Sequence, residues 1–316
     1  MKNAASLIGI VFGTSLLAVA ASGQGYPEHS ITMVVPFAAG GGTDTVARLA
    51  VPGLEAELGE TIVVQNIAGA GGTIGATELA ASDPDGYTIG FMPIGTMTTQ
   101  PHLRDVAYGA ESWEPICRLV DDPMSVLVAP DSGYETLDDL IAAASNGGQL
   151  RSAGPPPGSL PHIGQAALAN AYGLDLRYVP HEGGSAVARS LLGGQVDVFV
   201  DLAGNATKFG LVNLALLGGD ERHPQFPDLP TTMELGGHEL NYSIWFGMFA
   251  PAGTPDAVME VLAGACERLS SSPEYLETME EADRWVAYLG REDFNAFFQQ
   301  QFANNGSLLQ AIGMSQ

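Results

Sequence analysis

A β-branched run, a glycine cluster and the start of a helix follow one another directly near the beginning of the chain. The run Ile31–Val35 predicts a buried strand, which Pro36 ends because proline has no N–H to donate to a sheet. Gly40–Gly42 permit a sharp turn, and Thr43 or Asp44 can cap the helix that follows. Such a loop presents unpaired N–H groups where the helix dipole favours negative charge. The segment therefore predicts either an anion-binding site or a tight turn without a ligand.

The same succession occurs a second time. Thr61–Gln65 predicts a strand, Asn66–Thr73 is rich in glycine, and a helix is expected from Ile74 to Ala81. Loops that follow neighbouring parallel strands open on one crevice, which is where open α/β sheets bind ligands. The repetition therefore favours the anion site. Neither loop is a nucleotide motif, since Thr45 replaces the third glycine of the dinucleotide pattern and no Gly-Lys-Ser/Thr follows.

The N-terminus has the pattern of a secretory signal peptide. An apolar run from Leu7 to Val19 follows the charge of Lys2 and precedes small residues around Ala20. We expect residues 1–24 to be cleaved and the mature protein to be exported. No other stretch approaches the length of a membrane span, so we do not expect a membrane-embedded protein. No cysteine stands near the cleavage site, which argues against a lipoprotein.

Charge and cysteine content restrict the partners and the redox chemistry. The chain has 12 Lys and Arg against 36 Asp and Glu, a net charge of −24. Nucleic acid is excluded as a partner because phosphate binding needs clustered basic residues, and anionic membranes are disfavoured. Export permits a disulfide between the two cysteines, Cys117 and Cys266. Sequence gives no distance between them, so two buried thiols remain the alternative.

The order of elements predicts an α/β protein with two domains. The strand–helix rhythm restarts after Asp121-Asp122-Pro123, and two long helices are expected at the C-terminus. Those helices need a sheet to cover, so we expect the chain to return to its first domain. The predicted boundaries are 25–123 plus 245–316 for domain 1 and 124–244 for domain 2. Phenylalanines at helical spacing in the last helix are expected in the core: Phe294, Phe297, Phe298 and Phe302.

Several motifs in order resemble one family. They are Val34–Gly41, Gly69–Gly75, Pro84–Thr88, Gly193–Asp197 and Trp245–Gly247 before Pro251–Pro255. With these the chain resembles the Bug-type periplasmic receptors of the tripartite tricarboxylate transporter system. The resemblance implies a two-lobed, type II-like solute-binding fold, each lobe a βα sheet sandwiched by helices, joined by a two-strand hinge. It also implies a periplasmic monomer without cofactor or metal. Such a receptor closes on a small carboxylate and delivers it to the transporter's membrane subunits.

The resemblance places the ligand between the domains. Domain 1 would hold the carboxylate mainly through backbone amides, and domain 2 would contact the distal end of the ligand. The implied site residues are Phe37, Ala39, Gly40, Gly41, Asp44, Gly71, Gly72, Thr73, Thr96, Gly158, Ser159, His162, Gly183, Ser185 and Asp201. We expect Asp44 to hold the loop amides or Arg48, because an anion should not touch a carboxylate. Ser159 is expected to cap a helix. His162 either donates to the ligand or fixes the loop.

Two features leave the distal chemistry and the role open. Relatives usually carry a tyrosine and often a lysine where this chain has His181-Glu182. An exported hydrolase acting on an anionic substrate is the alternative to a receptor. However, the six histidines lack metal-ligand spacing, and neither Gly-x-Ser-x-Gly nor His-Glu-x-x-His occurs. A sensory receptor that passes its ligand state to a signalling partner is a third possibility, which the sequence does not separate from transport.

Overall fold

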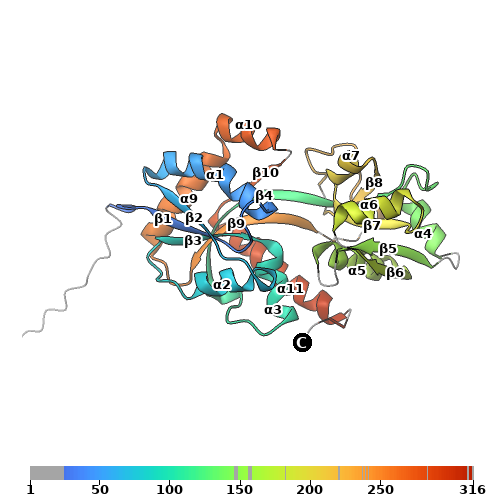
Figure 1. Ribbon diagram of the computed structural model, residues 1–316, viewed down its shortest axis with the longest axis horizontal. Coiled ribbons are helices and arrows are strands. Elements are labelled where there is room, and N and C mark those ends of the chain that lie inside the picture. Colours follow the sequence, from blue (N-terminus) through green and yellow to red (C-terminus); the bar gives the residue numbers. More distant parts are fainter. Residues whose placement is uncertain are drawn as a thin grey trace, which may run out of the picture.

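The computed structural model describes residues 25–145, 149–155, 159–181, 183–219, 221–236, 238, 240, 242–282, 284–311 and 313–314. Strands and helices alternate along the chain and form two lobes joined by long strands (Figure 1). The predicted two-lobed α/β fold is therefore confirmed. No helix in the described part of the chain is long and apolar enough to cross a membrane.

Lobe one is built on a mixed sheet with helices on both faces. Its strands run in the order β2 (Ile62–Asn66), β1 (Ile31–Val35), β3 (Thr88–Pro93), β9 (Ser243–Pro251) and β4 (Trp113–Val128), with β10 (Val286–Leu289) beside β4. The first three are parallel, and β9 is antiparallel to β3 and β4. One face packs against α1 (Gly42–Leu58), α9 (Asp256–Ser270) and α10 (Pro273–Glu281). The other packs against α2 (Thr73–Ala80) and α11 (Arg291–Ala311).

Lobe two repeats the parallel arrangement with different strands. Its parallel strands are β6 (Leu176–Pro180), β5 (Leu150–Gly154) and β7 (Val198–Leu202), and the end of β4 lies between β7 and β8 (Val212–Leu216). One core cluster contains α4 (Leu137–Ser145) and α5 (Leu160–Tyr172). The opposite face holds α6 (Gly184–Leu192) and α7 (Asn205–Phe209). The short helices α3 (Gln100–Leu103) and α8 (Thr232–Gly236) complete the chain.

The two strands β4 and β9 form the connection between the lobes. β4 pairs with β9 as far as Pro123, and from Met124 onward it pairs with β7 and β8 instead. The chain returns at Tyr242, whose carbonyl accepts a hydrogen bond from Met124 N, and enters β9 at Ser243. A third contact is made by α11, because Leu309 near its end is fully buried in the core cluster of lobe two. The last helix therefore touches both lobes.

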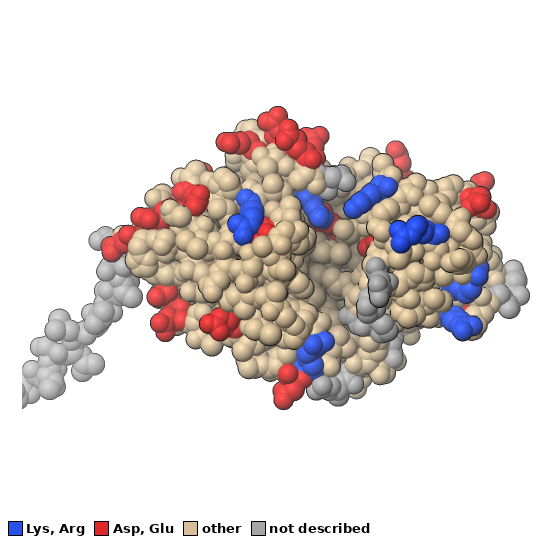
Figure 2. Space-filling view, in the orientation of Figure 1, with Lys and Arg blue, Asp and Glu red and all other residues tan. Residues whose placement is uncertain are grey.

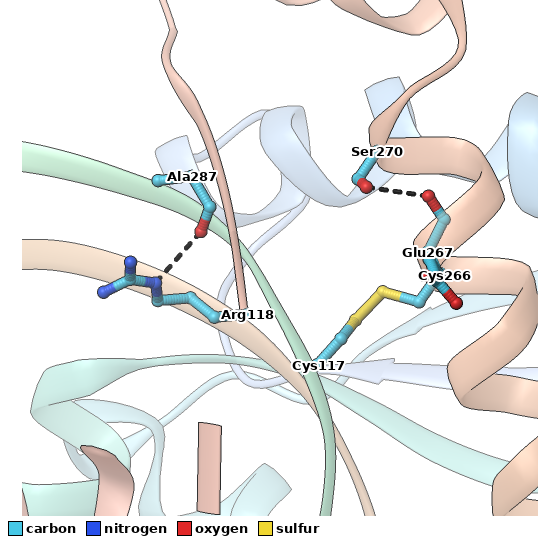
Figure 3. Close-up of a disulfide and its surroundings, with 6 residues drawn as sticks. All are labelled: Cys117, Arg118, Cys266, Glu267, Ser270 and Ala287. Atoms are coloured by element: carbon cyan, nitrogen blue, oxygen red, sulfur yellow. Dashed lines mark hydrogen bonds between the residues drawn. A yellow bond between two sulfur atoms is a disulfide. The ribbon is translucent and has the colours of Figure 1, made fainter. Parts of the chain in front are cut away.

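The core of lobe one contains a disulfide and an aromatic cluster. Cys117 of β4 is bonded to Cys266 of α9, with the Cα atoms 6.5 Å apart, so the alternative of two thiols is wrong (Figure 3). The neighbouring Arg118 points away from the disulfide and donates to Ala287 O of β10. Phe294 and Phe298 are fully buried in the cluster around Trp245, as their spacing predicts.

Candidate ligand-binding site

In each lobe the order of the parallel strands reverses at one point, and the helices of the connections on the two sides of that point lie on opposite faces of the sheet. In lobe one this point lies between β1 and β3, because α1 follows β1 on one face and α2 precedes β3 on the other. In lobe two it lies between β5 and β7, with α5 on one face and α6 on the other. The loops diverge at such points and leave a crevice at the carboxyl ends of the strands. Each lobe therefore offers one crevice.

The two crevices open toward each other. Leu160, the first residue of α5, packs against the core cluster of lobe one. A Cβ atom built on Gly95, just after β3, would lie 3.8 Å from the Leu160 side chain. The start of α5 in lobe two thus contacts the end of β3 in lobe one. Figure 2 shows a hollow between the two lobes.

Asp44 organises the first glycine loop from inside. Its side chain accepts hydrogen bonds from Gly40 N (2.8 Å), Arg48 Nε (2.9 Å) and Asn66 Nδ2 (2.8 Å). Asn66 also donates to Phe37 O, so the end of β2 is tied to the loop after β1. Burial alone would raise the pKa of Asp44, but these hydrogen bonds hold it below its ordinary value. The prediction that Asp44 holds the loop and Arg48 is confirmed.

The loop amides are arranged differently from the expectation. Gly40 N donates to Asp44, and Gly41 N donates to Ala38 O at 3.1 Å, so both amides are engaged within the loop. The N–H groups of Gly42, Thr43 and Asp44 at the start of α1 have no acceptor in the described chain, and the same holds for Ala38 and Ala39 earlier in the loop. The start of α1 therefore offers donors to an anion in addition to those of the loop. The sequence does not predict the bond from Gly41 N to Ala38 O, because the two groups meet only in the folded loop.

The second glycine loop packs against the first. Gly71 and Gly72 have φ of 71° and 90°, which glycine adopts without strain. A Cβ atom on Gly72 would lie 2.4 Å from Thr96 Oγ1 and 3.3 Å from the Phe37 ring. Thr96 Oγ1 in turn donates to Gly71 O at 3.2 Å. Three loops thus bring together Phe37, Gly72 and Thr96, as the predicted site requires.

The remaining predicted residues of lobe one lie close to these. Thr73 is buried at the start of α2, where its hydroxyl donates to Ala70 O, while Ala39, Gly40 and Gly71 are exposed. Asn66 is a residue that the sequence reading missed. A polar side chain directly after a predicted strand and before a glycine loop was the signal that could have found it.

In lobe two the loop after β5 differs from the prediction in one respect. Ser159 occupies the N-cap position of α5 with extended φ and ψ, as predicted, but its side chain makes no capping hydrogen bond. The His162 ring lies 4.2 Å from the Tyr178 ring, and burial lowers the His162 pKa, which favours neutral imidazole at neutral pH. Gly158 lies outside the described residues.

His181, the residue that departs from the pattern of relatives, is turned into lobe two. Its Nδ1 bonds to Val179 O at 2.9 Å and its Nε2 to Ser190 Oγ at 2.7 Å. Because a carbonyl only accepts, Nδ1 carries the proton and Nε2 accepts from the serine in the neutral ring. His181 therefore fixes the start of the β6–α6 turn and has no ring nitrogen left for a ligand.

The last predicted residues surround the start of α6. Gly183 has φ of 93° and precedes the helix, and Ser185 is exposed in its first turn. Asp201 near the end of β7 is 8% exposed, and its Oδ2 lies 3.2 Å from where a Cβ atom on Gly184 would be. Asn205 Nδ2 donates to the same oxygen at 2.9 Å. Burial raises the Asp201 pKa to about 6, against the opposing effects of the Leu202 amide, Asn205 and Lys208.

Comparison with known proteins identifies the family. Residues 46–314 match the family described as tripartite tricarboxylate transporter family receptor. The chain belongs to this receptor family. It is 28% identical to a TctC solute-binding protein from Polaromonas, solved without ligand, with a TM-score of 0.81 over 90% of this chain and 99% of that one.

Two further relatives of the receptor family were solved with ligands. MatC from Rhodopseudomonas palustris with bound malate is 28% identical, with a TM-score of 0.70 over 90% of this chain and 100% of that one. A second R. palustris protein, with adipate, is 25% identical, with a TM-score of 0.73 over 92% and 99%. Both names give small dicarboxylates as ligands of the relatives.

The arginines beside the glycine loops of this family member are engaged by other described residues. Arg48 is held by Asp44 and Asn66, and Arg104 donates to Ala70 O. The open donors are backbone N–H groups at the N-terminus of α1, where the helix dipole also favours a negative charge. What lobe one offers at the glycine loops is therefore backbone N–H donors and not a free guanidinium group.

Proposed function

We propose that this chain is a periplasmic receptor that captures a small carboxylate between its lobes and delivers it to the membrane subunits of a tripartite tricarboxylate transporter. The observation that carries the proposal is the meeting of the two crevices, where Leu160 of lobe two contacts Gly95 of lobe one. Open α/β sheets bind ligands at such crevices. Residues 1–24 serve as the export signal in this proposal.

The ligand's carboxylate is held by the N–H groups at the start of α1. Gly42, Thr43 and Asp44 each point an unpaired donor out of the first turn. Hydrogen bonds to a charged acceptor are about twice as strong as neutral ones. Malate and adipate in relatives support a small carboxylate as the ligand class.

Capture occurs by closure of two bodies, 25–123 plus 245–316 and 124–244. The pairing of β4 changes from β9 to β7 and β8 between Pro123 and Met124, and the second connection runs from Tyr242 to Ser243. Rotation about these two adjacent points opens and closes the cleft. The ligand favours the closed form by the contacts that it makes only there.

A matched pair of variants tests the amide site. Gly42 is exposed, is the first residue of α1 and has open space where a Cβ atom would be. Gly41 before it has φ −75° and ψ 168°, a conformation that a following proline accepts. Gly42→Pro therefore removes one N–H without breaking the helix, whereas Gly42→Ala keeps that N–H.

The experiment starts with a thermal-shift screen of a carboxylate library, followed by calorimetry with the best ligand. Gly42→Pro should weaken binding about tenfold or more, because a hydrogen bond to a charged group contributes about 1.5–3 kcal/mol. Gly42→Ala should bind like the wild type. Equal affinity of both variants would place the carboxylate elsewhere, and a library without any stabilising carboxylate would contradict the proposed function.

A further inference from the structure

Lobe two contains a buried carboxylate that forms no ion pair with any residue that the structure describes. We propose that Asp201 receives a hydrogen-bond donor on the distal part of the ligand, so that the receptor selects amino- or hydroxy-substituted carboxylates over plain dicarboxylates of the same length. An ammonium group is favoured because it also carries the opposite charge. This inference rests on the proposed carboxylate site and adds the ligand's chemical class to it.

Asp201 stands at the crevice of lobe two. It is one residue before the end of β7, paired with Ser125 of β4. On its other side, β7 runs parallel to β5, with Phe199 opposite Ala153, so Asp201 lies level with the loop that leads to α5. It shares a strand face with Phe199, which belongs to the cluster under α6 and α7. Asp201 therefore lies between the starts of α5 and α6, where the strands of lobe two diverge.

The other buried aspartates of the described chain each have an arginine. Asp44 pairs with Arg48, and Asp122 pairs with Arg284 at 2.5 Å. Asp201 forms no ion pair with any described residue, and its side-chain partner is the neutral amide of Asn205. A buried charge is costly unless it is paired, so one more donor is needed to complete its surroundings.

A purely structural role for Asp201 is not seen at the nearest helix. Its Oδ2 lies close to Gly184 at the start of α6, the place of a capping carboxylate. However, its hydrogen-bond partners among the described residues are Asn205 and the Leu202 amide, and neither belongs to α6. Asp201 is 8% exposed.

The charge of Asp201 decides between ligand classes. A plain dicarboxylate would bring a second anion to a buried anion, which lowers its affinity. Its binding should improve as the pH falls through about 6, where Asp201 becomes protonated. An ammonium ligand should show the opposite trend. The groups that act on Asp201 are the Leu202 amide, Asn205 and the Lys208 ammonium group, with Gly184 and Phe209 as uncharged neighbours.

The test is calorimetry at pH 7.5 with two sets of equal length: succinate, malate and aspartate, then glutarate, 2-hydroxyglutarate and glutamate. In at least one set we expect the amino or hydroxy compound to bind at least tenfold more tightly than the plain dicarboxylate. Asp201→Asn should reduce that ratio to below threefold. Asp131→Asn, which removes one exposed carboxylate of lobe two, is the matched control and should keep the wild-type ratio.

A second readout separates recognition from folding. The affinity of the wild type for the preferred amino compound should fall as the pH drops from 7 to 5, and the affinity of Asp201→Asn should change less. His162 is also titratable in lobe two, which makes this variant the necessary reference. If the affinities of all six ligands lie within threefold of one another, the inference about Asp201 is wrong, but the proposed carboxylate receptor is still supported. Binding of none of them would overturn both.

Discussion

The crevices of the two lobes each contain a buried aspartate, and the two are treated in opposite ways. Asp44 in lobe one is surrounded by an arginine, an asparagine and a backbone amide, which together hold its pKa below the ordinary value. Asp201 in lobe two has one asparagine and the Leu202 amide but no arginine, and burial raises its pKa to about 6. The buried aspartate of lobe one is therefore paired with a cation without a ligand, whereas that of lobe two is not. We infer that lobe one recognises what all ligands share and lobe two recognises what distinguishes them.

The disulfide should give the largest difference between the lobes, because lobe two contains no cysteine. Cys117 and Cys266 are 149 residues apart, and closing a loop of that length stabilises a protein by about 5 kcal/mol. The double variant Cys117→Ala/Cys266→Ala should lose about this much free energy of unfolding in urea. Hydrogen exchange should accelerate in β4 and α9 and stay unchanged in β5 and β6. Equal acceleration in both lobes would show that they unfold as one unit.

Replacement of Arg48 in lobe one should have the next largest effect on the free energy of unfolding. Arg48→Ala leaves the Asp44 carboxylate buried and without its cation, which should cost about 3 kcal/mol of unfolding free energy. Carboxylate binding should also weaken, because the Gly40 loop loses its anchor. The double variant Arg48→Ala/Asp44→Asn should recover part of the stability. A loss below about 1 kcal/mol in Arg48→Ala would mean that Asn66 and the loop amide suffice for Asp44.

The corresponding change in lobe two should have the opposite sign. A pKa raised from 3.8 to about 6 destabilises the folded state by about 3 kcal/mol above pH 6, and this penalty fades as the pH falls toward 4. Asp201→Asn removes the penalty, so the unliganded variant should be more stable than the wild type by about 2 kcal/mol at pH 7.5. Urea unfolding at pH 7.5 and pH 4 measures the effect, and a gain of equal size at both values would exclude the titration as its cause.

The smallest predicted effect concerns the contact between Asp201 and α6. A Cβ atom on Gly184 would lie 3.2 Å from Asp201 Oδ2, so Gly184→Ala should displace the carboxylate by a few tenths of an ångström. We expect about a threefold loss of affinity for the preferred ligand, less than 1 kcal/mol. Gly42→Ala, with open space at the same atom, is the control. An unchanged affinity would place the ligand's donor away from this oxygen.

The sequence predicts the elements of this receptor better than their contacts. The strand, glycine loop and helix from Ile31 onward follow from local residue preferences, and so does the partnership of Asp44 with Arg48, four residues apart on one helix. The sequence does not decide whether Cys117 and Cys266 form a disulfide, because the distance between them depends on how α9 packs on β4. The bond from Gly40 N follows from the expected role of Asp44, whereas the bond from Gly41 N to Ala38 O was missed because these two groups approach only when the loop closes on itself.

For the same reason, the sequence does not predict which residues of the two lobes contact each other. Nothing local relates Leu160 to Gly95, since Leu160 begins α5 in lobe two and Gly95 follows β3 in lobe one. Ser159 shows the limit even within one turn. Its residue type favours a cap and its backbone has the right conformation, yet its side chain does not form the bond. Side-chain rotation is decided by neighbours such as Tyr178 and His162, which come from packing.

The end of α11 has a mechanical consequence. Helix α11 packs beside Trp245 in lobe one and buries Leu309 in the core of lobe two, so it connects the two bodies across the hinge. Full separation of the two bodies must either expose Leu309 to water, at a cost of about 1.5–3 kcal/mol, or bend α11. The Leu309 contact thus favours the closed arrangement of the two bodies even without a ligand. The free energy of this contact sets the fraction of ligand-free molecules that are open.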